Sequence, residues 1–184
     1  MNYDSYTGMM LHNYHLYDYD GKIQILPWDY NLGFGSFPLD SSFDHENDST
    51  LVVNKGIDTP LVSTDPESRP LWKWIVSDNA YLEQYHKEMD KLIKEQFESG
   101  KIINELDRIH QLIVPYIEKD ATAFYTPAEA EKGFEVLKEL RLLRAESIRR
   151  QLNGRLPADT DEQNSEDRVD ASKISLNDLN SFGF

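Results

Sequence analysis

The sequence predicts an α+β fold in which one β-hairpin precedes a mainly α-helical body. Short apolar and aromatic runs flank an Asp-Gly turn near residue 20, which is the pattern of a two-stranded hairpin. From residue 69 onward, apolar residues recur every three or four positions, which is the pattern of amphipathic helices. The chain has 184 residues, enough for one domain with a hydrophobic core.

The predicted hairpin covers residues 14–26 and reverses at Asp20-Gly21. Its second strand runs into Asp29 and a glycine-rich loop, so Asp29 leaves the hairpin close to where the first strand began. Asp4, His12 and Asn13 precede that strand, and we expect them to lie near Asp29. Carboxylate and amide oxygens are ligands for Mg²⁺. Asp and Asn are also ordinary turn and capping residues, so local hydrogen bonding is the other interpretation of this cluster.

Residues 36–68 are rich in Ser, Asp, Asn, Pro and Gly. Apolar breaks such as Leu51-Val52-Val53 are brief, so we predict a long loop with at most one short strand. Loops of this length are often functional or mobile, but an ordinary surface excursion fits the composition equally well.

The helical body is predicted from residue 69 to about residue 154. Pro70 suits a first helical turn, and Asp78 is a plausible cap for the next helix, which Gly100 ends. A third helix follows from about residue 101 to residue 120. Thr126-Pro127-Ala128-Glu129 then has the form of a capping box that opens the last helix.

Four arginines gather late in that last helix. Cations suit the negative end of a helix dipole, so solvated side chains are the first interpretation. Contact with phosphate or an acidic partner is the alternative. The four residues are Arg141, Arg144, Arg149 and Arg150.

Residues 155–184 hold seven Asp or Glu against three Lys or Arg and few large apolar groups. Such a composition buries too little surface to offset chain entropy, so an acidic, disordered or loosely attached tail is expected. Phe182 and Phe184 could anchor its end on the body.

Charge and composition exclude several partners. The net charge of −14 argues against nucleic acid or an anionic membrane as partner. It is compatible with a basic protein substrate, although it could serve solubility alone. The chain has no cysteine, which excludes disulfides and thiolate metal sites, and no apolar run approaches a membrane span.

Residues 2–35 resemble the CotH family, which comprises spore-coat protein H and its relatives with an atypical protein-kinase-like fold. The resemblance lies in Asn-x-Asp-Ser-Tyr-x-Gly at residues 2–8 and His-Asn-Tyr-x-Leu-Tyr at residues 12–17. It continues through the Asp-Gly turn to Pro-Trp-Asp-Tyr-Asn-Leu-x-Phe-Gly at residues 27–35. It extends loosely into Asp58-Thr59-Pro60-Leu61 and Arg69-Pro70-Leu71.

The resemblance implies that residues 1–154 form a protein-kinase-like C-lobe and that the cofactors are Mg²⁺ and ATP. It places Asp29 where a kinase holds magnesium, and Asn13 where a catalytic-loop Asn holds a second metal. Asn31 is a possible further cofactor-binding residue, and Asp4 is the candidate for accepting the substrate hydroxyl proton. Phosphoryl transfer depends mostly on positioning and charge neutralisation, which such residues supply.

The function implied is phosphoryl transfer to Ser or Thr of spore-coat or cell-surface proteins, and a basic, Ser-rich protein is the expected substrate. The nucleotide-covering N-lobe and its lysine have no counterpart here. We therefore expect the chain to be the carboxyl-terminal part of a longer protein and to be inactive alone. The alternatives are a non-catalytic scaffold or binding module of a coat or surface, and a metal-binding domain without a nucleotide role.

Overall fold

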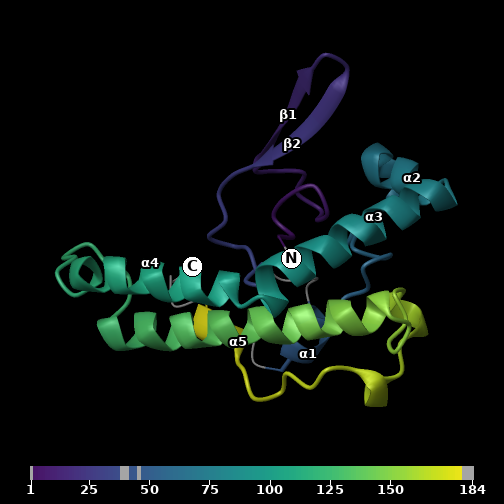
Figure 1. Cartoon of the computed structure of the whole chain (residues 1–184). Coiled ribbons are helices and arrows are strands. Elements are labelled where there is room, and N and C mark those ends of the chain that lie inside the picture. The colour runs from purple at the N-terminus through teal and green to yellow at the C-terminus, as the bar shows by residue number, and fades with distance from the viewer. Residues whose placement is uncertain (1, 38–41, 45–46, 180–184) are drawn as a thin grey trace.

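The computed structural model describes residues 2–37, 42–44 and 47–179, and within them the fold is α+β, as predicted. One antiparallel hairpin stands away from the helices, and α4 and α5 run side by side (Figure 1). The elements are β1 (Tyr14–Tyr19), β2 (Lys22–Pro27), α1 (Ser49–Asn54), α2 (Pro70–Val76), α3 (Asn79–Leu92), α4 (Lys101–Ile117) and α5 (Pro127–Leu152).

The hairpin closes through the predicted Asp-Gly turn. Tyr19 pairs with Lys22, and Asp20 and Gly21 between them have φ values of 53° and 72°. Positive φ at both central residues gives a turn whose twist matches that of the strands. Every side chain of the two strands except that of Tyr14 is exposed. The hairpin therefore projects from the helical body and does not pack on it along its length (Figure 1).

The predicted helix starts are confirmed. The Asp78 carboxylate accepts a hydrogen bond from the Ala80 amide, and Thr126 and Glu129 form the reciprocal capping box of α5. A π-helical turn, Ile93–Glu98, extends α3 up to Gly100, whose φ of 76° separates it from α4. These starts and stops depend on neighbours in the sequence, which is why the pattern predicts them.

The helix at residues 49–54 corrects the prediction that residues 36–68 form a loop with at most one short strand. Leu51, Val52 and Val53 lie in α1, and both valine side chains are fully buried. β-branched residues favour strands, but propensity is a weak prior that tertiary packing overrides. Residues 38–41 and 45–46 of the predicted loop lie outside the described residues.

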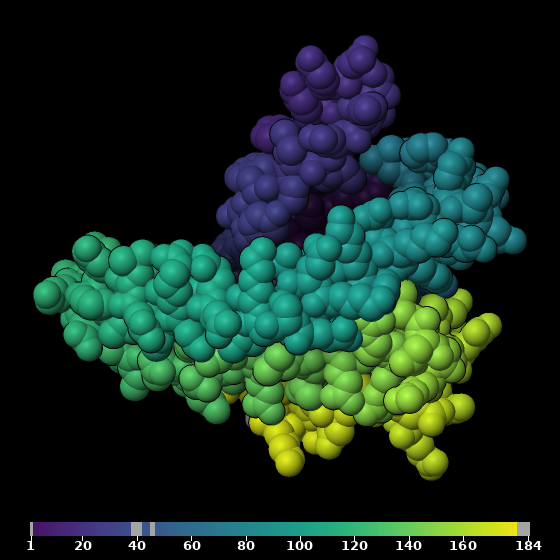
Figure 2. Space-filling model, viewed as in Figure 1, coloured from purple at the N-terminus to yellow at the C-terminus, as the bar shows by residue number. Residues whose placement is uncertain are grey.

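The core lies between α1, α5 and the segment that follows α5. Four core residues, Val169, Ala171, Ile174 and Leu176, come from the segment for which a disordered or loosely attached tail was expected. Over residues 155–179 this segment is packed against the body. Figure 2 shows this segment along the underside of α5. Its few apolar residues face inward, and Ser49 and Asn54 of α1 bond its backbone at Ala171 and Val169. Phe182 and Phe184 lie outside the described residues. The core residues are Val52, Val53, Val136, Leu140, Val169, Ala171, Ile174 and Leu176.

Candidate functional site

The loop of residues 2–8 carries Asp4 and is fixed by two close contacts. A Cβ added to Gly8 would lie 1.5 Å from the Tyr3 carbonyl oxygen, so only glycine fits at this position. The buried guanidinium of Arg69, just before α2, donates to the carbonyl oxygens of Tyr6 and Gly8. The backbone around Asp4 is therefore held from both inside and outside the loop.

Asp4 and Asn13 meet in a buried pair. The Asn13 side-chain amide donates to Asp4 Oδ2 at 2.7 Å, and both residues are more than nine-tenths buried. A charge-assisted bond of this kind is stronger than a neutral one, and it fixes which way the Asn13 amide faces. The structure thus brings two of the predicted site residues into direct contact.

Asn13 also connects the loop to the strand that leads to Asp29. The Trp28 amide donates to the Asn13 carbonyl oxygen at 2.9 Å, which closes the base of the hairpin. Asn13 and Asp29 have φ values of 58° and 57°, a left-handed conformation that Asn and Asp adopt more readily than most residues. The Asp29 side chain is exposed at this base. The structure thus places the two predicted metal ligands on backbone segments that bond to each other.

The other predicted residues lie nearby in the chain but make weaker contacts. His12 is exposed, with Nδ1 4.0 Å from Asp4 Oδ1, so it flanks the carboxylate. Asn31 is exposed in the turn that the Gly33 amide closes by donating to the Tyr30 carbonyl oxygen. The sequence prediction of Asn31 as a cofactor-binding residue stays a prediction.

The donor types fit a hard cation. Because the Asn13 nitrogen donates to Asp4, its oxygen is left to accept from another group, and the Asp29 carboxylate is open to solvent. Within residues 2–37, 42–44 and 47–179, no three His, Cys, Asp or Glu side chains are grouped to hold a metal. Mg²⁺ commonly takes one or two carboxylates and completes its shell with water and phosphate oxygens, so a sparse donor set suits it better than Ca²⁺.

These features define an α+β protein with acid and amide side chains gathered at the base of a projecting hairpin. A family model described as CotH kinase protein matches residues 1–148, and the chain belongs to that family. The family is associated with kinase-like and spore-coat functions, and its kinase-like fold is consistent with the structure described above. No curated protein and no solved structure matches the chain.

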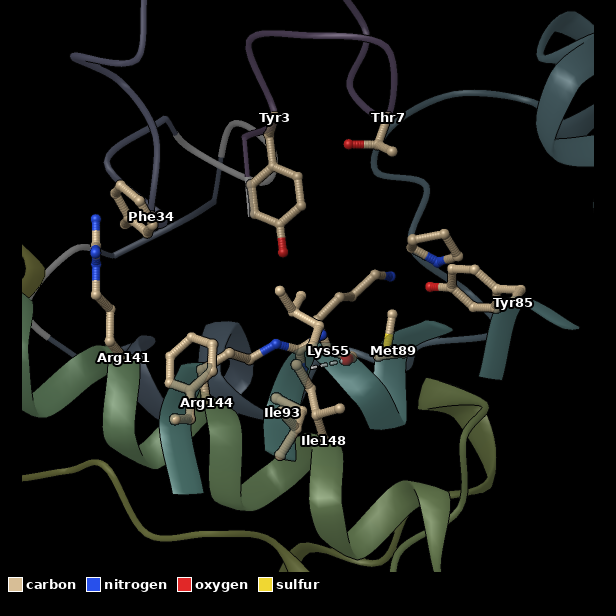
Figure 3. A pocket seen from close by; sticks show the side chains of 13 residues that line it. Tyr3, Thr7, Phe34, Lys55, Tyr85, Met89, Ile93, Arg141, Arg144 and Ile148 are labelled. Carbon is tan, nitrogen blue, oxygen red and sulfur yellow. Dashed lines mark hydrogen bonds between the residues drawn. The ribbon is translucent and has the colours of Figure 1, made fainter. Parts of the chain in front are cut away.

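Sequence reasoning missed a cavity that lies between residues 3–7, α3 and α5 (Figure 3). Arg144 was expected in solvent, but it is half-buried there, and its guanidinium donates to the carbonyl oxygens of Val53 and Lys55. A signal for this existed. Arg144 falls at helical spacing in the apolar stripe of Leu137, Leu140 and Ile148. A residue in that stripe faces the core and not the solvent, which predicts a buried position for this cation.

Arg149 and Arg150 make the surface ion pairs expected of a solvated helix end. Arg149 bonds Asp90 of α3 and Glu98 of the π-helical turn, and Arg150 bonds Glu146 within α5. Pairs of this kind contribute little to stability individually.

No helix in the described part of the chain combines the length and the apolarity that crossing a bilayer requires.

Proposed function

We propose that this chain supplies the metal-binding and proton-accepting residues of a protein kinase that uses Mg²⁺ and ATP. The protein acceptor would be a Ser or Thr side chain of a spore-coat or surface protein. The observation that carries the proposal is the position of Asn13 between Asp4 and Asp29. Its side chain donates to Asp4, and its carbonyl oxygen accepts from the Trp28 amide, next to Asp29.

Each residue has a distinct role in the proposal. Asn13 and Asp29 would hold the metal through oxygen atoms, and Asn31 would assist in binding the cofactor. When bound, the metal supplies charge neutralisation at the transferred phosphoryl group. Asp4 would orient the acceptor hydroxyl and take its proton, while Arg69 and Gly8 keep the Asp4 loop in place.

A scaffold function is the second candidate, and one observation favours it. The hairpin exposes large apolar side chains on both strands, including Leu16, Tyr19 and Ile23, each more than half exposed. Exposed apolar patches of this kind mark interaction surfaces. A surface module could use the hairpin to contact other coat proteins without transferring phosphate.

Transfer of labelled phosphate from ATP tests the two candidates. The chain would be expressed with any coding sequence that precedes it in frame and incubated with Mg²⁺ and γ-labelled ATP. We expect label in protein, and we expect Asp29→Asn to abolish it because the amide removes the negative charge. The control is Asp20→Asn, an exposed Asp with the same left-handed backbone in the hairpin turn. Absence of label in the unchanged protein, or equal label in Asp29→Asn, would favour the scaffold.

A further inference from the structure

The cavity in Figure 3 has a volume of about 360 Å³ and mixed walls. Its apolar wall comes mainly from α3, the π-helical turn after it and α5. Its polar wall comes from the chain's first loop, from the residue after α1 and from α5. Pockets with a mainly apolar lining and a few convergent polar groups are typical ligand sites. The apolar wall includes Phe34, Met89, Leu92, Ile93, Phe97 and Ile148, and the polar wall includes Tyr3, Lys55, Arg141 and Arg144.

The cavity gathers three cations without an acid to neutralise them. Among the described residues, Lys55, Arg141 and Arg144 form no ion pair, whereas seven other Lys or Arg side chains do. The chain has 33 acidic residues against 19 basic ones, so acidic partners are abundant elsewhere. Asp159 and Asp161 act on Lys55 only at longer range. Burial lowers the pKa of all three cations, which means that their charges lack full solvation.

A buried hydroxyl adds a donor to this cationic wall. Tyr3 is 2% exposed, and its hydroxyl has no hydrogen-bond partner in the described structure. Figure 3 shows the hydroxyl directed toward the space above Arg144 and Lys55. A buried polar group without a partner is costly, so such groups in folded proteins call for a ligand or water. Arg141, whose guanidinium stacks over Phe34, leaves its buried Nε unpartnered in the same way.

We infer that this cavity binds a small organic carboxylate with an aromatic or aliphatic body. The carboxylate would lie between the Tyr3 hydroxyl and the cations of Lys55 and Arg144, and the body would contact the apolar wall formed by Met89, Ile93 and their neighbours.

The mainly apolar lining favours a carboxylate over a phosphate, because the ligand's charge must be desolvated there. One nitrogen of Arg144 is already engaged by the Val53 and Lys55 carbonyl oxygens, and its other N–H groups, the Lys55 ammonium and the Tyr3 hydroxyl remain as donors for two carboxylate oxygens. A carboxylate has two oxygens to satisfy, whereas a phosphate monoester has three oxygens and a larger charge to desolvate. A neutral ligand would leave the three cations uncompensated.

This site is separate from the candidate cation site, because it attracts the opposite charge. The two are nevertheless joined through the backbone. Tyr3 directly precedes Asp4, and Phe34 follows Asp29 in the same turn-rich segment. A bound carboxylate would therefore contact both of the segments that carry the candidate kinase residues.

Titration calorimetry with a matched pair of probes tests the inference on the full chain. The probes are 3-phenylpropionate and its neutral amide, 3-phenylpropanamide. We expect the acid to bind and the amide to bind at least about tenfold more weakly, because only the acid has a negative charge that can pair with the cations. Tyr3→Phe and Lys55→Met should each lower the affinity for the acid about tenfold, the effect of losing one hydrogen bond to a charged group.

The control is Lys173→Met, which removes an exposed cation away from the cavity and should leave the affinity unchanged. Tyr3→Phe removes a hydroxyl that has no partner, so a folded variant is expected, and circular dichroism checks this. Equal binding of acid and amide, no binding of the acid, or unchanged affinity in both cavity variants would overturn the inference. Tighter binding of phenyl phosphate than of the acid would overturn the assignment to carboxylates. No outcome depends on phosphate transfer, so the kinase proposal is tested separately.

Discussion

Asn13 is the residue around which the candidate site is arranged. Its side chain donates to Asp4, its carbonyl oxygen accepts from the Trp28 amide, and its backbone is left-handed. Left-handed backbone in a residue other than glycine costs free energy and often occurs at functional sites. Asp29 has the same conformation, so both residues take a backbone geometry that Asn and Asp adopt more readily than most residues.

Asp4 has two possible roles, which one substitution separates. Asp4→Asn keeps an oxygen that can accept from Asn13, but it removes the carboxylate that would take a proton. If Asp4 is the general base, phosphate transfer should fall by about 10² to 10⁴-fold while affinity for Mg²⁺ and ATP stays within about tenfold. Single-turnover transfer and equilibrium binding of ATP measure the two effects. Full transfer activity in Asp4→Asn would leave Asp4 with a structural role only.

Tyr3 predicts how stability depends on alkaline pH. Burial raises its pKa from 10.0 to about 12. Below pH 10 the folded and unfolded chains both keep the phenol proton. Between pH 10 and 12 the unfolded chain loses it first, so the free energy of unfolding should fall as pH rises, by about 2 kcal/mol for this group.

Urea unfolding across this pH range measures the loss. In Tyr3→Phe the alkaline loss of stability should be smaller by that amount. Some loss should remain, because burial also raises the pKa of Tyr85 to about 12. Tyr116→Phe is the control, since Tyr116 is 73% exposed. An alkaline loss of the same size in all three chains would show that the Tyr3 phenol is not buried as described.

At the scale of elements, the sequence predicted what local signals determine. The Asp20-Gly21 turn, the Asp78 cap and the Thr126–Glu129 capping box each depend on residues within four positions of one another. The structure departs from prediction where contacts span long separations. The bonds from Asn54 to Val169 join residues 115 positions apart, and no periodicity in either segment reveals them.

The same contrast between local signals and long-range contacts applies to the two sites. A hairpin returns to its starting point, so the meeting of the Asn13 and Asp29 segments was predictable. The cavity was not, because Tyr3, Lys55 and Arg144 come from three distant parts of the chain. The one sequence signal of the cavity was Arg144, a cation within the apolar stripe of α5.

The packing of residues 155–179 against α1 gives a prediction about Asn54. This side chain is 1% exposed and bonds both the amide and the carbonyl oxygen of Val169. Asn54→Ala should lower the free energy of unfolding by about 3 kcal/mol, because it leaves buried backbone groups unpaired. It should also expose residues 155–179 to protease.

Urea unfolding and limited proteolysis with mass spectrometry measure both effects. The control is Asn104→Ala, on the exposed face of α4, which should change stability by no more than about 0.5 kcal/mol. Rapid cleavage within residues 155–179 of the unchanged chain would show instead that this segment is not docked.

At the scale of the whole molecule, charge is sorted between two sites. Acidic residues dominate the chain, and the candidate cation site at the hairpin base presents carboxylate and amide oxygens. Three cations without acidic partners gather instead around the cavity below it. The proposed cation site and the proposed anion site would both depend on this separation, because opposite charges in one site would neutralise each other.

The central claim is that Asn13 and Asp29 hold one cation. Mn²⁺ can replace Mg²⁺ as a paramagnetic probe, and it broadens NMR signals of nuclei close to it. The signals to follow are those of the Asn13 side-chain amide, assigned by their loss in Asn13→Ala, during a titration with Mn²⁺ and ATP. Asp20→Asn serves again as the matched control for charge and backbone.

We predict that substoichiometric Mn²⁺ broadens the Asn13 amide signals in the unchanged chain and in Asp20→Asn, and that Asp29→Asn greatly reduces the broadening. Broadening of the same size in Asp29→Asn, or Asn13 signals that stay sharp while Mn²⁺ binds elsewhere, would contradict a cation site shared by these two residues.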